Sequence, residues 1–517
     1  MSCGCMNRRE FLTTTSLGIG GALTLGASNL YSNPDTWEWD PDKPMGTYGK
    51  QITVLPVLRH RIESYKEKTS WRNWGGVHTE QSAREEVQRI TKELSMLKRK
   101  INFPVKILPV VRATSHQEAR KYRDMNNVDV MILYAAGAGY DEGLDPALSD
   151  KRYNIIFTRH RSGPVYDWYE NVHNRFLRVG GDNFEYDHFR NYAGINWDDI
   201  VVDDYNEILW RLSAFYGLKN FIGKRIVALG GAAGKFCPKA PEQNKKVFNL
   251  DIQTVSYDDL AVRIKKAQSD KKLIAKTKKW TRQYLSILNT KKNTKTEFIE
   301  RAFLLYGIFK DYLKEYDTDA LTINACMGTI LNVSETTACL PLSLMNDEGL
   351  IALCESDFSV IPAGILLHYI SGKPVFMNNP TYPHKGITTC AHCTAPRRMD
   401  GKNYEYAEIT THYESDYGAA PKVEMPIGQE ITLICPNCEQ SYWMGFKGTV
   451  DANPYMPICR TQQDINIQGD WKKLAKEYGG SHWMMAYGDH LDAVGYAIKK
   501  AGLKWTNVSG DNLISNA

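Results

Sequence analysis

The sequence lacks a strong excess of charge of either sign. Its 517 residues carry a formal net charge of +5, which is too small for a chain of this length to indicate binding to nucleic acid. Lysines do cluster between Lys265 and Lys295, but apolar residues at helical spacing lie among them, and this pattern favours a solvated helix face. We therefore expect no nucleic-acid partner.

The amino terminus lacks a hydrophobic run long enough to span a membrane. The weakly apolar stretch Leu17–Ala27 is shorter than the roughly 20 residues that a spanning helix needs. It follows the segment NRREFL, in which Arg8 and Arg9 match the pair of a twin-arginine export signal, and small residues near Ala27 offer a cleavage site. We expect a periplasmic protein, exported in the folded state, with no membrane span once the signal is removed.

Cysteines are too few and too dispersed for a disulfide scaffold. Two of the 11 lie in the signal, which leaves nine, an odd number spread over a large chain. The pairs Cys390-x-x-Cys393 and Cys435-x-x-Cys438 have the spacing of a structural zinc site, although they lie farther apart than the pairs of a zinc ribbon. The alternative for the second pair is a hairpin turn between two strands, and the sequence leaves both open.

Two glycine-rich turns lack the spacing of nucleotide-binding motifs. The segment Ala135–Tyr140 (AAGAGY) follows an apolar strand, but no helix stands directly behind it and no ribose-binding acid follows at the right distance. The segment Gly230–Lys235 (GGAAGK) does not have the GxxxxGK[ST] spacing of a phosphate loop. We interpret both as tight turns, so nucleotide binding is not expected.

What the sequence does contain is an alternation of apolar strands and amphipathic helices. A chain of 517 residues and 58.8 kDa is too long for one core, so two or three domains are expected. The alternation predicts parallel, doubly wound sheets. The expected strands are Ile52–Leu58, Val105–Val111, Val128–Tyr134 and Asn154–Thr158, then Arg225–Leu229, Ile252–Val255 and Ala320–Ala325. After Thr389 apolar and polar residues alternate between turn residues, which predicts β-structure.

The stretch Leu321–Met399 carries side chains that suit a metal site. Glu355 and Asp357 precede the apolar segment FSVIPAGILLHYI, so both are expected in a first helical turn, where the macrodipole and unpaired N–H groups favour a charged carboxylate. His392 lies between Cys390 and Cys393. From spacing alone, a helix-capping acid and a core histidine explain these residues equally well.

Two amides follow the next expected strand. Lys373–Met377 has the pattern of a short buried strand, so Asn378 and Asn379 are expected at its carboxyl end. In α/β sheets this edge is where ligands bind. The alternative from spacing alone is a turn amide.

An ordered series of segments resembles the carboxyl-terminal half of the L-fucose/L-arabinose isomerase superfamily, and most closely its fucose isomerase-like branch. The segments are CLPLSLMNDEGLIALCESD, GKPVFMNN, CAHCTAPRRM, GQEITL, CRTQ and SHWMMAYGDH. The resemblance covers about Ala320 to the end of the chain. It implies a divalent ion, usually manganese, that is held by one acid at a helix start, a second acid after the next strand, and histidines.

Position by position, the resemblance places the first acid at Glu355, the second at Asn378, and the histidines at His392 and His482. Asn378 departs from the pattern, because an amide oxygen can bind a hard cation but cannot carry a proton.

The resemblance also implies that GQEITL is a barrel strand. The expected fold is therefore α/β, with two doubly wound parallel-sheet domains followed by a C-terminal antiparallel β-barrel domain. The expected ranges are a signal (1–28), a linker (29–50), α/β domains (51–190 and 191–388) and the barrel (389–517).

The function that the resemblance implies is a divalent-metal-dependent aldose–ketose isomerisation through an enediol. Glu355 is then a metal ligand and proton carrier, Asp357 a second catalytic acid, and Asn379 a substrate-binding residue. The expected partners are a small-molecule sugar and further copies of the chain in a homo-oligomer. The alternative is a non-catalytic carbohydrate-binding protein on the same scaffold, because sugar rings stack on aromatic faces and the chain has 29 Tyr and 12 Trp.

Overall fold

The computed structural model describes residues 37–68, 76–137, 146–166, 194–477 and 479–510. These residues form two compact units, one of residues 49–219 and one that joins residues 37–48 to residues 220–510. The predicted export signal, residues 1–28, lies outside the described residues. In the part of the chain that the structure describes, no helix is both long enough and apolar enough to cross a membrane.

The first unit is built on a parallel sheet with the strand order β2-β1-β4-β5-β6, and β3 also pairs with β1. Strands β1 and β4 are buried along almost their whole length, as both faces of a parallel sheet require. The expected strand Val105–Val111 is divided into β2 and β3 near Pro109, which has no N–H for the ladder. The strands are β1 (Ile52–Arg59), β2 (Val105–Ile107), β3 (Val111–Ala113), β4 (Val130–Ala135), β5 (Tyr153–Thr158) and β6 (Ile200–Val202).

The helices of the first unit begin and end where local signals predict. In α2 the Thr79 side chain accepts from the Ser82 backbone N–H in a capping box, and basic residues occupy the last turn. Buried Arg159, just after β5, lies 2.6 Å from Glu86 Oε1 and so ties the sheet to α2. The helices are α2 (Glu80–Lys100), α3 (His116–Arg123) and α6 (Tyr205–Phe221), which ends in the second unit.

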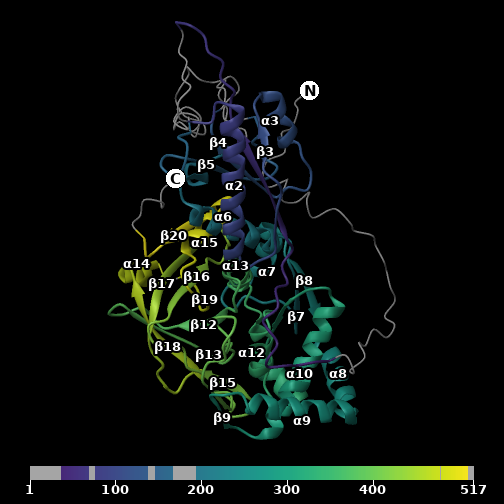
Figure 1. Cartoon of the computed structure of the whole chain (residues 1–517). Helices are drawn as coiled ribbons and strands as arrows, with labels where there is room; N and C mark the ends of the chain where they lie inside the picture. The colour runs from purple at the N-terminus through teal and green to yellow at the C-terminus, as the bar shows by residue number, and fades with distance from the viewer. Residues whose placement is uncertain (1–36, 69–75, 138–145, 167–193, 478, 511–517) are drawn as a thin grey trace, which may run out of the picture. The chain divides into compact units, whose positions relative to one another are not determined.

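The second unit contains a smaller parallel sheet with the order β11-β10-β7-β8. Its strands are β7 (Arg225–Leu229), β8 (Asp251–Val255), β10 (Ala320–Ile323) and β11 (Ile351–Leu353). Its helices are α7 (Ala240–Phe248), α8 (Tyr257–Ser269), α9 (Lys271–Leu285), α10 (Thr296–Glu315), α11 (Cys326–Ser334), α12 (Cys339–Asp347) and α13 (Ile361–Ser371). Helices α8, α9 and α10 lie on the same side of the unit as β7 and β8 (Figure 1).

The second unit also contains a closed antiparallel barrel. Six strands follow one another in the order β16-β19-β12-β13-β18-β17, and pairing of β16 with β17 closes the ring. The strands, green to yellow in Figure 1, are β12 (Phe376–Pro380), β13 (Ile387–His392), β16 (Glu430–Pro436), β17 (Tyr442–Ala452), β18 (Thr461–Gln468) and β19 (Trp483–Tyr487). The fold class predicted from the sequence is therefore confirmed.

Smaller elements complete the second unit. Strand β20 (Lys504–Asn507) pairs with β17 in parallel outside the ring. A separate three-stranded sheet joins β9 (Thr290–Asn293), β14 (Ala407–Thr410) and β15 (Ala420–Val423). Helices α14 (Trp471–Glu477) and α15 (Leu491–Lys500) flank β19 in the sequence.

The boundaries of the first unit and of the barrel differ from the domain boundaries predicted from the sequence. Strand β6 and most of α6 belong to the first unit, so that unit ends at Lys219 and not at residue 190. Strand β12 and the first residues of β13 are barrel strands, although they precede residue 389. A short buried strand has the same apolar pattern in a parallel sheet and in a barrel, so the sequence could not assign β12 to the correct sheet.

The expected linker, residues 29–50, is not a free linker over its described part. Trp37 and Trp39 are buried in the core of the second unit. The indole Nε1 of Trp37 donates to Asp311 Oδ1 at 2.8 Å, and a Cβ at Gly307 of α10 would lie 2.1 Å from the Trp37 ring. The segment that follows the predicted signal therefore packs against helix α10 through Trp37.

We expect Trp39→Ala to lower the free energy of unfolding of the second unit by about 3–5 kcal/mol, as truncation of a buried Trp usually does. The Trp39 ring packs edge-on against Tyr284 and Phe303 at centroid distances of 5.9 and 5.0 Å. Urea unfolding followed by circular dichroism measures the effect. Leu288→Ala is the control, because Leu288 is 81% exposed. Equal stability of the two variants would show that this segment does not support the core.

Candidate metal centre

The loop after β11 carries two acidic side chains in a strained backbone. Glu355 and Ser356 have φ angles of +59° and +42°, a left-handed conformation that is costly for residues other than glycine and is concentrated at functional sites. Helix α13 begins only at Ile361. The prediction that Glu355 and Asp357 lie in a first helical turn is therefore wrong, and the helix dipole does not explain their charge.

Barrel strands bring two histidines to the Glu355 carboxylate. His392 ends β13, and His482 immediately precedes β19. Their Nε2 atoms lie 3.5 and 3.6 Å from the same oxygen, Glu355 Oε1. One ligand atom of each of the three side chains lies within 4.8 Å of the others. Both histidines are buried, so the arrangement is enclosed by protein on the barrel side.

The other ring nitrogen of each histidine is held by a polar partner. His392 Nδ1 lies 3.0 Å from Thr394 Oγ1, and His482 Nδ1 lies 2.6 Å from Asp357 Oδ2. Metal-binding histidines are usually oriented in this way, often by a carboxylate. Asp357 is fully buried and also accepts from Ser359 Oγ at 2.6 Å. Asp357 therefore positions His482 and leaves its Nε2 directed at Glu355.

Charge is distributed unequally over the centre. Burial raises the pKa of Glu355, but the contacts with His392 and His482 outweigh it and hold the pKa well below its usual range. Burial lowers the pKa of His392, so this ring is neutral at neutral pH. Lys235 Nζ donates to Glu355 Oε2 at 2.9 Å and offsets part of the negative charge. Burial lowers the pKa of His482, but its contacts with Asp357 and Glu355 outweigh this and raise the pKa. The centre thus offers an ionised carboxylate and one neutral imidazole, and a cation that binds His482 Nε2 displaces a proton there.

Two buried polar atoms are left unsatisfied by the part of the protein that the structure describes. His482 Nε2 and Asn378 Oδ1 are buried and have no hydrogen-bond partner among the described residues. A polar atom left in this state is costly, and a ligand or ion commonly satisfies it. Glu355, His392 and His482 would hold a divalent ion, because nitrogen and carboxylate oxygen are suitable donors. Asn378 is fully buried, and its amide oxygen stays a predicted fourth ligand.

The predicted substrate-binding residue, Asn379, has a structural contact at the centre. Its Nδ2 donates to the carbonyl of Ser481 at 2.9 Å. This bond holds the residue before His482. A role for Asn379 in binding a substrate stays a prediction.

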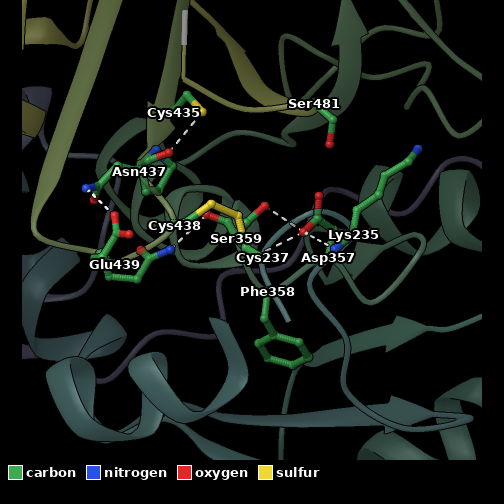
Figure 2. Close-up of a disulfide and its surroundings, with 12 residues drawn as sticks. Lys235, Cys237, Asp357, Phe358, Ser359, Cys435, Asn437, Cys438, Glu439 and Ser481 are labelled. Carbon is green, nitrogen blue, oxygen red and sulfur yellow. Dashed lines mark hydrogen bonds between the residues drawn. A yellow bond between two sulfur atoms is a disulfide. The ribbon is translucent and has the colours of Figure 1, made fainter. Parts of the chain in front are cut away.

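The four cysteines of the possible zinc site do not assemble in the structure. Cys438 forms a disulfide with Cys237, and the Cys435 thiol donates to the carbonyls of Pro436 and His482. Residues 437–441 connect β16 and β17, so the alternative interpretation as a hairpin turn is confirmed. Figure 2 shows the disulfide beside Asp357 and Lys235.

Neither Lys235 nor the partner of Cys438 is predicted from the sequence. Lys235 ends the glycine-rich GGAAGK segment, whose pattern predicts only a tight turn. That segment follows β7 at the carboxyl edge of the parallel sheet, where ligands bind in α/β proteins. Its position was therefore a usable signal, whereas nothing local pairs Cys237 with a residue 201 positions away.

No protein-family model matches this chain. No curated protein matches it either. The function is therefore inferred from the geometry of Glu355, His392 and His482 and from the sequence segments that carry the resemblance.

Proposed function

We propose that this protein is a divalent-metal-dependent enzyme that interconverts an aldose and a ketose. The observation that carries the proposal is the convergence of Glu355, His392 and His482 within 4.8 Å of one another. The first of these follows a strand of the parallel sheet and the other two come from the barrel. The resemblance to sugar isomerases independently implies that these three residues, together with Asn378, are ligands of a manganese ion.

The proposed chemistry moves a proton between neighbouring carbons of a sugar through an enediol. A bound divalent ion, with manganese as the proposed metal, supplies polarisation of the carbonyl and hydroxyl oxygens. Among the chain's own groups, Glu355 is the carboxylate that a sugar can reach, because its side chain is 37% exposed whereas that of Asp357 is 0% exposed. Glu355 is therefore the proposed proton carrier. For Asp357, predicted as a second catalytic acid, we propose a positioning role instead, and its contact with His482 Nδ1 supports this.

A second candidate function is sugar binding without turnover. Asn378 favours it, because the amide in the position of the second acid cannot carry a proton. In this case the centre would hold an ion and a sugar, but no proton transfer would follow.

Metal analysis and hydrogen exchange distinguish the two functions. We expect purified protein to contain one divalent ion per chain and to exchange the proton on the carbon next to the carbonyl of its sugar in D₂O, which NMR detects. A bound ion without exchange across a panel of pentoses and 6-deoxyhexoses would support the binding protein. Absence of any bound ion after dialysis against Mn²⁺ would contradict both.

We also propose that the protein reaches the periplasm by the twin-arginine route. The motif that supports this lies in residues 7–12, outside the described residues. Replacing Arg8 and Arg9 together with Lys should leave the protein in the cytoplasm, because the export machinery reads the arginine pair. Cell fractionation measures the distribution. Unchanged export of the double variant would count against this route.

A further inference from the structure

The Cys237–Cys438 disulfide links the two parts of the second unit that build the candidate centre. Cys237 lies in the loop after β7 of the parallel sheet, and Cys438 lies in the turn between β16 and β17 of the barrel. Glu355 and Asp357 come from the parallel-sheet side, whereas His392 and His482 come from the barrel side. The disulfide therefore connects the parallel-sheet side to the barrel side, and the candidate centre also takes its residues from both sides.

On the sheet side, the loop that carries Cys237 holds the strained Glu355–Asp357 loop. Ala233 donates its N–H to the Ser356 carbonyl at 3.1 Å and accepts from the Phe358 N–H at 2.9 Å. Lys235 reaches both acids: its backbone N–H donates to Asp357 Oδ1 at 3.2 Å and its Nζ to Glu355 Oε2 at 2.9 Å. Displacement of this loop would change the position of both carboxylates.

On the barrel side, the turn that carries Cys438 contacts the same region from the opposite direction. Gln440 is fully buried, and its Nε2 donates to the carbonyl of Ser359 at 2.9 Å. The Cys435 thiol, at the start of the turn, donates to the carbonyl of His482 at 3.5 Å. The disulfide thus joins two loops that hold the centre from its two sides.

The disulfide is also the cysteine pair that a thiol reagent can reach. Both of its residues are half-buried, and both line a pocket of about 270 Å³ together with Phe236, Pro436 and Ser481. Among the described residues, six of the seven free cysteines are buried, and Cys459 is half-buried. Since exchange requires access of the attacking thiolate, a thiol in solution can reach and reduce this bridge.

We propose that the Cys237–Cys438 disulfide is a redox switch that controls the affinity of the candidate centre for a divalent ion. In the closing direction, the two thiols lose two electrons and two protons to a disulfide of an exchange partner. In the opening direction, a dithiol attacks one sulfur, forms a mixed disulfide and leaves as its own cyclic disulfide, and the protein keeps two thiols. The inference rests on the metal site of the proposed function, but not on sugar turnover.

The expected effect follows from the contacts of the two loops. Opening the bridge frees the Lys235 loop from the barrel turn, so that the Glu355–Asp357 loop is held less firmly against His482. Changes in the groups that orient metal ligands typically cost roughly 10–100-fold in metal affinity. An oxidising compartment such as the periplasm would then favour the metal-binding form.

The test is to measure Mn²⁺ affinity of the full chain in both redox states by electron paramagnetic resonance of free Mn²⁺. Wild type is measured oxidised, and again after reduction with a dithiol, alkylation of Cys237 and Cys438 and removal of the reductant. We expect the dissociation constant to rise roughly 10–100-fold on reduction. The double variant Cys237→Ser, Cys438→Ser should bind weakly in both conditions and should not respond to the reductant.

The outcomes of these measurements distinguish a failure of the redox switch from a failure of the metal site. Unchanged affinity of reduced and alkylated wild type overturns the switch, and this measurement does not depend on whether the double variant folds. An equal response of the double variant to the reductant also overturns it, because another thiol would then be responsible. If oxidised wild type binds no Mn²⁺, the metal site fails and with it the switch, which separates this result from a failure of the switch alone.

Discussion

Replacing Glu355 by Gln should abolish stoichiometric Mn²⁺ binding and sugar isomerisation together. Glu355 Oε1 is the oxygen that both histidines face, at 3.5 and 3.6 Å. The substitution keeps the size of the side chain but removes its negative charge and its ability to take up a proton. Because even groups outside the ligand shell change metal affinity by roughly 10–100-fold, loss of the carboxylate ligand should cost more. Loss of a general acid–base group should lower the rate by a further 10²–10⁴-fold, roughly.

Isothermal titration with Mn²⁺ and the D₂O exchange assay measure the two effects separately. Glu424→Gln is the matched control, because Glu424 also pairs with a lysine, Lys422, at 2.8 Å and its side chain is 42% exposed, close to the 37% of Glu355. The control should bind and exchange as wild type does. Retention of both properties by Glu355→Gln would falsify the assignment of the centre.

Replacing Asn378 by Asp should tighten Mn²⁺ binding and raise aldose–ketose activity. Asn378 Oδ1 is buried without a hydrogen-bond partner among the described residues, so a carboxylate there adds a charged donor that a hard cation prefers. It also restores a second group that can carry a proton. General acid–base groups contribute roughly 10²–10⁴-fold in rate, so a working substitution is easy to detect.

The same substitution should make stability depend on the metal. Asn378 is fully buried, and its Nδ2 donates to the Phe376 carbonyl at 3.1 Å. An aspartate loses that donor and buries a charge, which is costly unless a cation pairs with it. We therefore expect Asn378→Asp to unfold at a lower temperature than wild type without Mn²⁺ and to gain more from added Mn²⁺. Calorimetry with and without the ion measures both.

Asn154→Asp is the matched control for burial. Asn154 is 3% exposed, its Nδ2 donates to the Ser149 carbonyl at 2.8 Å, and its Oδ1 has no partner among the described residues. It lies in the first unit, so its variant should lose stability without responding to Mn²⁺. If wild type already isomerises a sugar at ordinary rates and Asn378→Asp abolishes this activity, then the amide itself is required and the proposed second proton carrier lies elsewhere.

The arrangement of strands and helices could be predicted largely from local sequence. Apolar runs in the sequence predicted the buried strands β1 and β4. Strand β12 was assigned to the parallel-sheet domain and not to the barrel, because a short buried strand has the same apolar sequence pattern in both kinds of sheet. The burial of Trp37 and Trp39 was not predicted for another reason, because two aromatic residues in a polar segment do not reveal that they pack against Gly307 and Phe303 of α10.

For the centre, the side chains that are able to bind a cation could be identified before the structure: an ionisable carboxylate at Glu355 and imidazoles at His392 and His482. The sequence did not determine what Asp357, Lys235 and Cys237 do. Asp357 meets His482 across 125 residues, Lys235 meets Glu355 across 120, and Cys237 meets Cys438 across 201. These pairs depend on the tertiary fold: Lys235 and Glu355 follow different strands of the parallel sheet, and the other two pairs join that sheet to the barrel. Local periodicity carries no information about either kind of contact.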